Sequence, residues 1–311
     1  MLITDKDQWY LPVSGVLLKM SDKLLKNRPL KKVILGAVDD LPPLPNILHQ
    51  ARAIIADPNS SFKDLEKLIV NDQAFAVKIL KIANSSYYGR VKKVSSIQDA
   101  TVIIGMKSLA ELITIASASF LFKNALPGYE LSAQALWRHS IAVAFGAKII
   151  AGRKYPALAN DAFSAGLIHD VGKLILDKYV YERREAFQEF MYDGHQTFLE
   201  AEKEILGFEH AEIAAFVCKK WNFPKSITVA IRYHHQPARF MSNKLAHLVH
   251  IADQITESIG MDIDGITLEI SDNSLEVAGV QIDEIAQIMD EITEYVEQVG
   301  DIVGLCPSSG P

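Results

Sequence analysis

The sequence predicts an all-α protein, because its apolar residues recur with the period of a helix and almost never with the period of a strand. Helix start signals recur along the chain. Ser61 and Ser96 are each followed by an aspartate three residues later, and Thr197 is followed by Glu200. Residues 266–270 alternate weakly and have no partner segment, so a short strand there does not change the expected fold class.

The proline-rich run Leu-Pro-Pro-Leu-Pro at residues 41–45 is the first clear boundary, because a helix cannot continue through it. Residues 1–37 form an N-terminal extension with weak signals. Residues 38–124 contain about four or five short helices and form a first helical subdomain. One of these helices runs to Ala83, where Asn84 closes it.

A second boundary lies at residues 125–128, Ala-Leu-Pro-Gly. Residues 125–260 follow as a second helical subdomain, which contains most of the residues with possible chemistry. Residues 261–311 form a C-terminal helical tail, in which residues 283–298 place isoleucine, methionine and valine side chains on one side of a helix. This apolar side is a candidate surface for a partner protein.

The composition indicates an ordinary globular protein and argues against two classes of function. Of the 311 residues, 49% are hydrophobic and 23% are charged, which is typical of neither disordered nor membrane proteins. The net charge of −6 argues against direct nucleic-acid binding, which needs a basic face. The most apolar segment, residues 109–122, is shorter than the roughly 20 residues that span a bilayer. Without a secretory signal, and with Cys218 and Cys306 in unrelated settings, we expect a cytoplasmic protein with reduced thiols.

The most informative feature is the pair His169-Asp170, which lies in the apolar stretch 165–176. Burying two polar groups is costly unless a partner satisfies them. A divalent metal ion is one such partner, since neutral imidazole and carboxylate are ordinary metal ligands. A structural hydrogen-bonded pair is the alternative, and without further ligands it would be favoured.

Other polar residues with apolar neighbours could share this site. The candidates are His139, His210, His234, His235 and Asp253. Each also has a simpler interpretation. His139 could be a satisfied core residue, His210 could face solvent at a helix start, and His234 could point outward at a helix end. Asp253 needs a buried partner, which is either a metal ion or His250 one turn earlier.

Taken in order, these residues and several separated motifs resemble the HDOD domain family, within the HD superfamily of metal-dependent phosphohydrolases. The motifs are the proline-rich run at 41–45, the stretches 79–89, 95–100 and 104–105, Ala-Gly-Leu-Ile-His-Asp-Val-Gly at 165–172, Trp-Asn-Phe-Pro at 221–224 and His-His-Gln-Pro at 234–237. The similarity covers residues 38–260.

The resemblance implies a helical bundle of the HD and HDOD type with two helical subdomains and a set of metal ligands. By the family's pattern these ligands are His139, His169, Asp170, His210, His234, His235 and Asp253. Such nitrogen and oxygen donors suit one or two divalent ions, iron or manganese rather than zinc or magnesium. His169 and Asp170 would be catalytic, and Lys173 could hold a phosphate oxygen.

Two functions follow from this resemblance. HDOD proteins are regarded as regulatory modules, so the first is a signal-transduction module that acts on a signalling protein partner. The second is a metal-dependent phosphohydrolase acting on a nucleotide or another phosphodiester. Related cyclic di-GMP phosphodiesterases carry Gly-Tyr-Pro after the double histidine, whereas this chain has Gln-Pro-Ala-Arg-Phe-Met at 236–241. We therefore do not expect cyclic di-GMP hydrolysis, and we expect no membrane partner.

Overall fold

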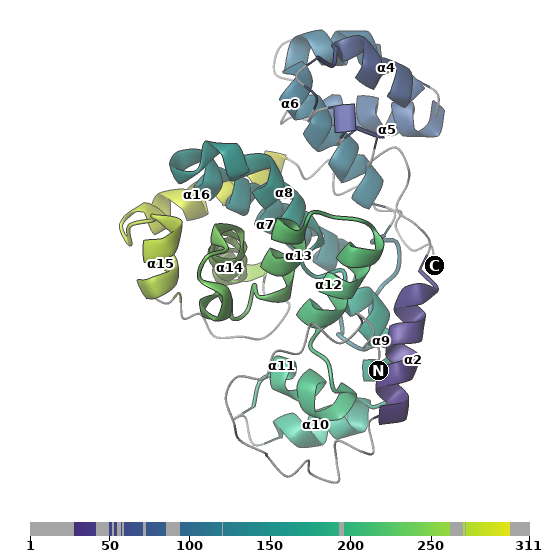
Figure 1. Ribbon diagram of the computed structural model, residues 1–311, viewed down its shortest axis with the longest axis vertical. Helices are drawn as coiled ribbons and strands as arrows, with labels where there is room; N and C mark the ends of the chain where they lie inside the picture. Colours follow the sequence, from purple (N-terminus) through teal and green to yellow (C-terminus); the bar gives the residue numbers. More distant parts are fainter. Residues whose placement is uncertain are drawn as a thin grey trace, which may run out of the picture.

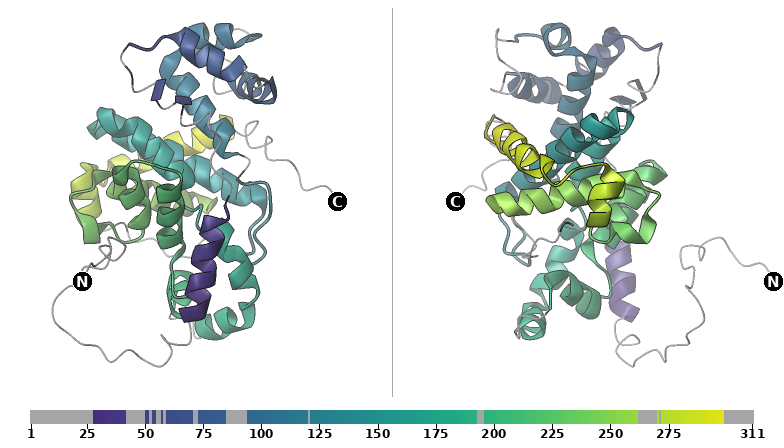
Figure 2. Two further views of the ribbon diagram at one scale, coloured as in Figure 1. Left: turned by 45° about the vertical axis from the view of Figure 1, so that its right-hand side comes forward. Right: turned by 90° about the vertical axis from the view of Figure 1, so that its left-hand side faces the viewer.

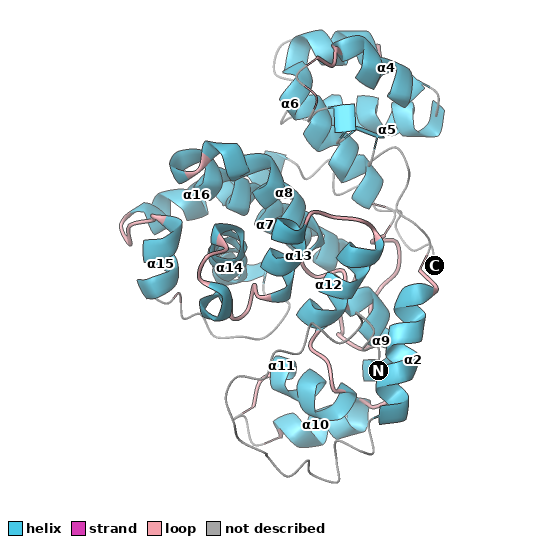
Figure 3. Cartoon of the chain, viewed as in Figure 1, coloured by secondary structure: helices cyan, strands magenta, loops and turns pink. Residues whose placement is uncertain are grey.

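The computed structural model is helical throughout the residues that it describes, which confirms the predicted fold class (Figure 3). Within those residues the β-type pairing is limited to an isolated bridge between Leu126 and Leu131. None of the described helices is long and apolar enough to cross a membrane. The described residues are 28–41, 50–51, 53–54, 57, 59–70, 73–84, 94–119, 121–192, 196–261, 270 and 272–298.

Several sequence features lie outside the described residues. They are the prolines of the run at 41–45, residues 85–89 of the 79–89 motif, the weakly alternating residues 266–269, and Cys306.

The first group of helices forms a small bundle at one end of the molecule (Figure 1). Its members are α4 (Phe62–Val70), α5 (Gln73–Ala83) and α6 (Ile97–Ala118). Asn84 closes α5 as expected and ties it to the approach to α6. Its side-chain amide donates to the carbonyl oxygen of Leu80, and its side-chain oxygen accepts from the backbone N–H of Val94, both at 2.8 Å. Ser96 then caps α6 by accepting from the backbone N–H of Asp99 at 3.0 Å.

The second group surrounds the central helix α7, whose faces are almost all buried. Helices α8 and α14 pack against α7, and α13 packs against α8, α12 and α14. In both views of Figure 2, this group lies between the α4–α6 bundle and the end of the molecule that contains α10 and α11. The members are α7 (Ala133–Lys154), α8 (Ala159–Ile168), α12 (His210–Lys220), α13 (Lys225–Arg232) and α14 (Lys244–Thr256).

A third group of helices packs against α12 through α9 and α2, and its other members pack onto α9 and one another. The group consists of α9 (Lys173–Tyr181), α10 (Arg184–Met191), α11 (Phe198–Ala201), the π-helical turn η2 (Glu202–Leu206) and α2 (Arg28–Asp39). Thr197 and Glu200 form the predicted capping box of α11, and Gly207 ends η2 with a φ of 82°. Helix α2 packs against α9 and α12, and Lys220 of α12 donates to the carbonyl oxygens of Val38, Asp39 and Leu41 at the end of α2.

The C-terminal helices α15 (Asp272–Ala278) and α16 (Glu284–Gln298) pack onto the central group. Ile288, Ile292 and Val296 of α16 are buried against the chain's own helices α7 and α14. The expectation that this apolar side is available to a partner is therefore wrong, because the fold itself covers it. The division into subdomains at residues 124 and 125 stays a prediction.

Candidate metal centre

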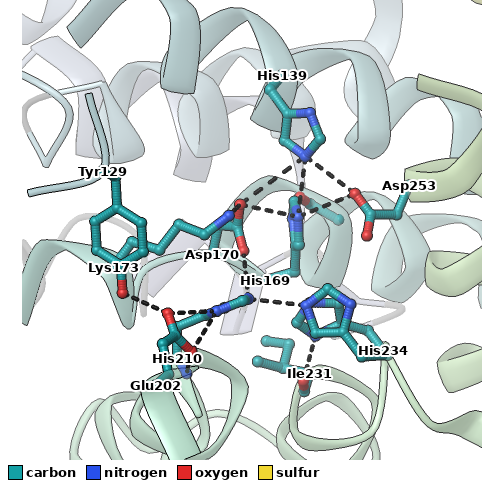
Figure 4. A network of polar contacts seen from close by, with 12 residues as sticks. Tyr129, His139, His169, Asp170, Lys173, Glu202, His210, Ile231, His234 and Asp253 are labelled. Carbon is teal, nitrogen blue, oxygen red and sulfur yellow. Dashed lines mark hydrogen bonds and ion pairs between the residues drawn. The ribbon is translucent and has the colours of Figure 1, made fainter. Parts of the chain in front are cut away.

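All seven sequence-predicted ligands converge between the helices of the central group. His139 comes from α7, His169 and Asp170 follow the end of α8, and His210 begins α12. His234 and His235 follow α13, and Asp253 comes from α14. Figure 4 shows the labelled ligands pointing toward one another from these separate elements. Residues far apart in the sequence thus form a single polar cluster inside an apolar core.

The first half of the cluster contains His139, His169 and Asp253, all of which are fully buried. The Nε2 atom of His139 lies 3.0 Å from Oδ1 of Asp253 and 3.3 Å from Nε2 of His169. The Nε2 atom of His169 lies 3.5 Å from the same carboxylate oxygen. Asp253 therefore faces two candidate ligands. His250 bonds elsewhere, to the carbonyl oxygen of His234 at 2.8 Å.

The second half contains His210, His234 and His235, each of which offers a nitrogen within 4.8 Å of the others. The Nε2 atoms of His210 and His235 are 2.9 Å apart. His234 is fully buried and His210 is nearly so, while His235 is partly exposed. Neither His210 nor His234 points to solvent, so the simpler interpretations of both residues are wrong.

Asp170 connects the two halves. Its Oδ2 atom lies 3.4 Å from Nε2 of His169, and its Oδ1 atom lies 3.2 Å from Nε2 of His210. Each carboxylate oxygen thus faces a different group of histidines. Asp170 would therefore help to hold a divalent ion at either group of histidines.

Backbone carbonyls fix the orientation of two of the rings. The Nδ1 atom of His169 lies 2.7 Å from the carbonyl oxygen of Gly166, and Nδ1 of His234 lies 2.6 Å from that of Ile231. A carbonyl oxygen only accepts, so each Nδ1 carries the proton when the ring is neutral, and Nε2 presents a lone pair to the cluster. The buried Nε2 of His234 has no hydrogen-bond partner among the described residues. A metal ion would supply that partner, so the residues fit a divalent cation.

The electrostatics of the cluster divide four of its histidines into two kinds. Burial opposes charge on His210, but the Glu202 carboxylate outweighs it and raises the pKa of His210 to about 10. Burial also opposes charge on His169, yet Asp170 and Asp253 together raise its pKa. Burial and neighbouring histidines hold the pKa values of His234 and His235 well below the usual range. Those two rings are therefore neutral and ready to bind a metal.

The carboxyl groups remain ionised despite their burial. His169 and Lys173 offset the cost of burial and hold the pKa of Asp170 well below its usual value. The nearby rings of His139 and His169 likewise offset the cost of burial and hold the pKa of Asp253 well below its usual value. Both aspartates are thus anionic at neutral pH and can act as ligands.

Two glycines allow the close helix packing that positions His169-Asp170. A Cβ atom on Gly166 would lie 2.8 Å from Cα of Ala144 in α7. A Cβ atom on Gly172 would lie 2.0 Å from the carbonyl oxygen of His210. Both contacts are with backbone atoms, which cannot move independently of their helices. The glycines in the Ala-Gly-Leu-Ile-His-Asp-Val-Gly motif therefore bring the pair against α7 and α12.

Lys173 lies beside the cluster, where its side chain is fully buried. Its Nζ atom donates to Oδ2 of Asp170 at 2.8 Å. In this arrangement Lys173 neutralises Asp170, and its role in holding a phosphate stays a prediction.

Sequence reasoning missed Glu202 and Tyr129. Glu202 is fully buried, and its carboxylate contacts Nδ1 of His210 at 3.0 and 3.1 Å. The Tyr129 hydroxyl donates to Oε1 of Glu202 at 2.5 Å. Glu200, Glu202 and Glu204 alternate along an acidic segment, and nothing in that pattern distinguishes the buried glutamate. Two other histidines of the chain, His49 and His195, lie outside the described residues.

The chain is similar to solved proteins of the same fold. An HDOD domain protein of unknown function from Geobacter sulfurreducens is 25% identical, with a TM-score of 0.76 over 91% of this chain and 99% of that one. A protein of Shewanella amazonensis SB2B that is provisionally described as a phosphohydrolase is 22% identical. Its TM-score is 0.68, over 87% of this chain and 96% of that one. A protein of Marinobacter aquaeolei VT8 that is provisionally described as a signal transduction protein is 22% identical. Its TM-score is 0.71, over 90% of this chain and 66% of that one. The last two similarities show the fold alone.

Sequence comparison identifies the family. An uncharacterised protein of Treponema pallidum (strain Nichols) is 26% identical over 203 residues, which are 65% of this chain and 39% of that protein. The chain thus corresponds to less than half the length of that relative. The family model of the HDOD domain matches residues 41–237, which include every candidate ligand except Asp253. This chain belongs to the HDOD domain family.

Proposed function

We propose that this chain is a regulatory module of signal transduction that binds one or two divalent metal ions between its central helices and acts on a signalling protein partner. The observation that carries this proposal is the convergence of seven buried or partly buried candidate ligands, among which Nε2 of His234 has no hydrogen-bond partner in the described part of the chain. Imidazole and carboxylate donors without thiolate favour iron or manganese over zinc. A cytoplasmic location belongs to this proposal, and the free thiol of the buried Cys218 is consistent with it.

The burial of the ligands favours a regulatory role over catalysis. His139, His169, Asp170, His234 and Asp253 have no exposed surface, and only His235 of the set is partly exposed. A phosphate substrate needs direct access to a metal-bound water. A bound ion would instead hold α7, α8, α12, α13 and α14 together, so that gain or loss of the ion changes their packing.

Metal analysis tests this proposal. We expect protein purified without added metal, or reconstituted with Fe²⁺ or Mn²⁺, to contain one or two ions per chain by elemental analysis. His169→Ala combined with Asp170→Ala should remove most of this metal, because it removes one candidate ligand of the first half and the carboxylate that connects the two halves. His247→Ala is the control, since His247 is a buried histidine outside the cluster. A wild-type chain that holds no metal after reconstitution would overturn the proposal.

A metal-dependent phosphohydrolase is the second candidate. The position of Asp170 between two groups of histidines favours it, because divalent ions held there would activate water and stabilise a leaving oxygen. When bound, the metal would supply that activation, while the residues of the two halves hold and orient it. The structurally similar Shewanella protein carries a provisional phosphohydrolase description.

Turnover separates the two candidates. We expect a phosphohydrolase loaded with Mn²⁺ to cleave bis-p-nitrophenyl phosphate or a cyclic nucleotide, and the His169→Ala, Asp170→Ala double variant to lose this activity. Equal rates for the wild-type and double-variant proteins would leave the regulatory module as the remaining proposal.

A further inference from the structure

We propose that Glu202 is a positioning residue that holds His210 in the orientation needed to bind metal and thereby tightens metal binding. This inference rests on the proposed metal site. It extends the site to a residue that is not itself a candidate ligand.

One carboxylate holds both the ring and the main chain of His210 (Figure 4). The Oε2 atom of Glu202 accepts from the backbone N–H of His210 at 2.7 Å and lies 3.0 Å from its Nδ1 atom. The Oε1 atom lies 3.1 Å from Nδ1. These contacts fix the position of the residue and the rotation of its ring together.

The direction of the ring matters for metal binding. Because Nδ1–H donates to Glu202, Nε2 points the opposite way, toward Asp170 at 3.2 Å and toward His235 at 2.9 Å. A carboxylate behind a metal-bound histidine also makes its ligating nitrogen more basic. Loss of such an outer partner typically weakens metal affinity about 10–100-fold.

The carboxylate of Glu202 is itself held in place. The Tyr129 hydroxyl donates to Oε1 at 2.5 Å, and the Tyr129 ring has Lys173 Nζ 5.9 Å from its centroid. Lys173 in turn donates to Asp170. A closed circuit of contacts therefore joins Asp170, Lys173, Tyr129, Glu202 and His210. A buried carboxylate is tolerated only when donors surround it in this way.

The backbone gives Glu202 a different environment from its neighbours. Glu202 begins the π-helical turn η2, which ends at Gly207 in the left-handed conformation. Glu202 is fully buried, whereas Glu204 in the same turn is exposed. Single π-helical turns often occur at functional sites. Glu204 therefore offers a control of the same residue type in the same turn.

A purely structural role is the alternative, since Glu202 also satisfies a backbone N–H at the start of α12. A double-mutant cycle separates the two roles. The set is Glu202→Gln, Glu204→Gln, His210→Ala and the combination of Glu202→Gln with His210→Ala. The affinity for Co²⁺ is measured by calorimetry, and the Co²⁺ absorption spectrum reports on the ligands.

We expect Glu202→Gln to weaken Co²⁺ binding about 10–100-fold and to change the visible spectrum, and Glu204→Gln to do neither. In the His210→Ala background, Glu202→Gln should cause no further loss. Co²⁺ binding that is equally tight in the wild type and in Glu202→Gln would overturn this inference and leave the metal site intact. A loss of the same size in both backgrounds would also overturn it, because Glu202 would then act independently of His210.

Failure of the wild-type protein to bind Co²⁺ would overturn the proposed metal site together with this inference. If Glu202→Gln does not fold, Tyr129→Phe decides in the same design, because it removes only the hydroxyl that holds Oε1. We expect a several-fold loss of Co²⁺ affinity that disappears in the His210→Ala background. Unchanged affinity of a folded Tyr129→Phe variant would overturn the inference.

Discussion

The histidines of the cluster differ in whether they must lose a proton before a metal can bind. His234 and His235 have pKa values well below the usual range and are already neutral. His210 has a pKa raised to about 10, because the Glu202 carboxylate outweighs the effect of burial. In the metal-free chain at neutral pH, His210 therefore carries a proton on both ring nitrogens.

Metal binding at His210 should release a proton. A metal ion needs the lone pair of Nε2, so the proton on that atom must leave, while Nδ1–H remains bonded to Glu202. Because His210 stays protonated up to about pH 10, we expect apparent Co²⁺ affinity to rise with pH between about pH 6 and pH 8. Calorimetry in two buffers with different ionisation enthalpies measures the number of protons released. A heat of binding that is the same in both buffers would contradict this protonation state.

The sequence predicted the candidate ligands, which the structure brings together, but it did not predict their protonation or the residues that support them. His169-Asp170 attracts notice because two polar residues lie in an apolar run, and the family pattern adds the other five ligands. Glu202 has no such signal, because its burial depends on the π-helical turn and not on its neighbours in sequence. The effect of Glu202 on the pKa of His210 therefore could not be predicted from the sequence either.

At the scale of helices, the distance between α9 and α12 is set by a single glycine. Gly172 has an ordinary helical φ of −63°, so its conformation does not require glycine. The close approach of α12 requires glycine at this position. A Cβ atom would lie 2.0 Å from the carbonyl oxygen of His210 and 2.8 Å from the backbone nitrogen of Ala214. The sequence placed a glycine after His169-Asp170 but could not identify the helix that approaches it.

Gly172→Ala should move α12 away from α9 and separate His210 from Asp170. We expect a loss of about 1–3 kcal/mol in the free energy of unfolding, as for other overpacked positions. Co²⁺ affinity should fall as well. Gly152→Ala is the matched control, because a Cβ at that exposed helical position would come within 4 Å of no described atom beyond its own turn of helix. It should stabilise the chain by about 0.5–1 kcal/mol and leave Co²⁺ affinity unchanged. Urea denaturation and calorimetry measure both effects, and a Gly172→Ala variant as stable as the wild type would show that α9 and α12 can separate freely.

At the scale of the whole molecule, the helical periodicity predicted that each helix has a buried face but not which helix covers it. Residues 283–298 illustrate the difference, because the same apolar side could bind a partner or the chain itself. In the structure α16 covers α7 and α14. Gly146 of α7 lies where they meet, since a Cβ there would be 2.7 Å from Cδ1 of Ile292 and 3.1 Å from Cβ of Ala252.

The position of α16 makes its apolar side part of the fold that supports the proposed metal site. Ile292 is fully buried, and it packs at the junction of α7, which carries His139, and α14, which carries Asp253. We expect Ile292→Ala to lower the free energy of unfolding by about 2–5 kcal/mol, because it leaves a cavity at this junction. Ile282→Ala is the matched control, since Ile282 is 73% exposed just before α16. Its effect should stay within about 0.5 kcal/mol.

Urea denaturation of the two variants, with and without Co²⁺, measures these effects. A bound metal stabilises the folded chain in proportion to its affinity. Ile292→Ala should therefore also reduce the stabilisation by Co²⁺, because the 3.0 Å contact between His139 and Asp253 depends on the spacing of α7 and α14. If Ile292→Ala instead left stability unchanged and altered only the association of the chain with other proteins, α16 would be a docking surface and not a part of the core. The burial of Ile288, Ile292 and Val296 against the chain's own helices argues for the first outcome.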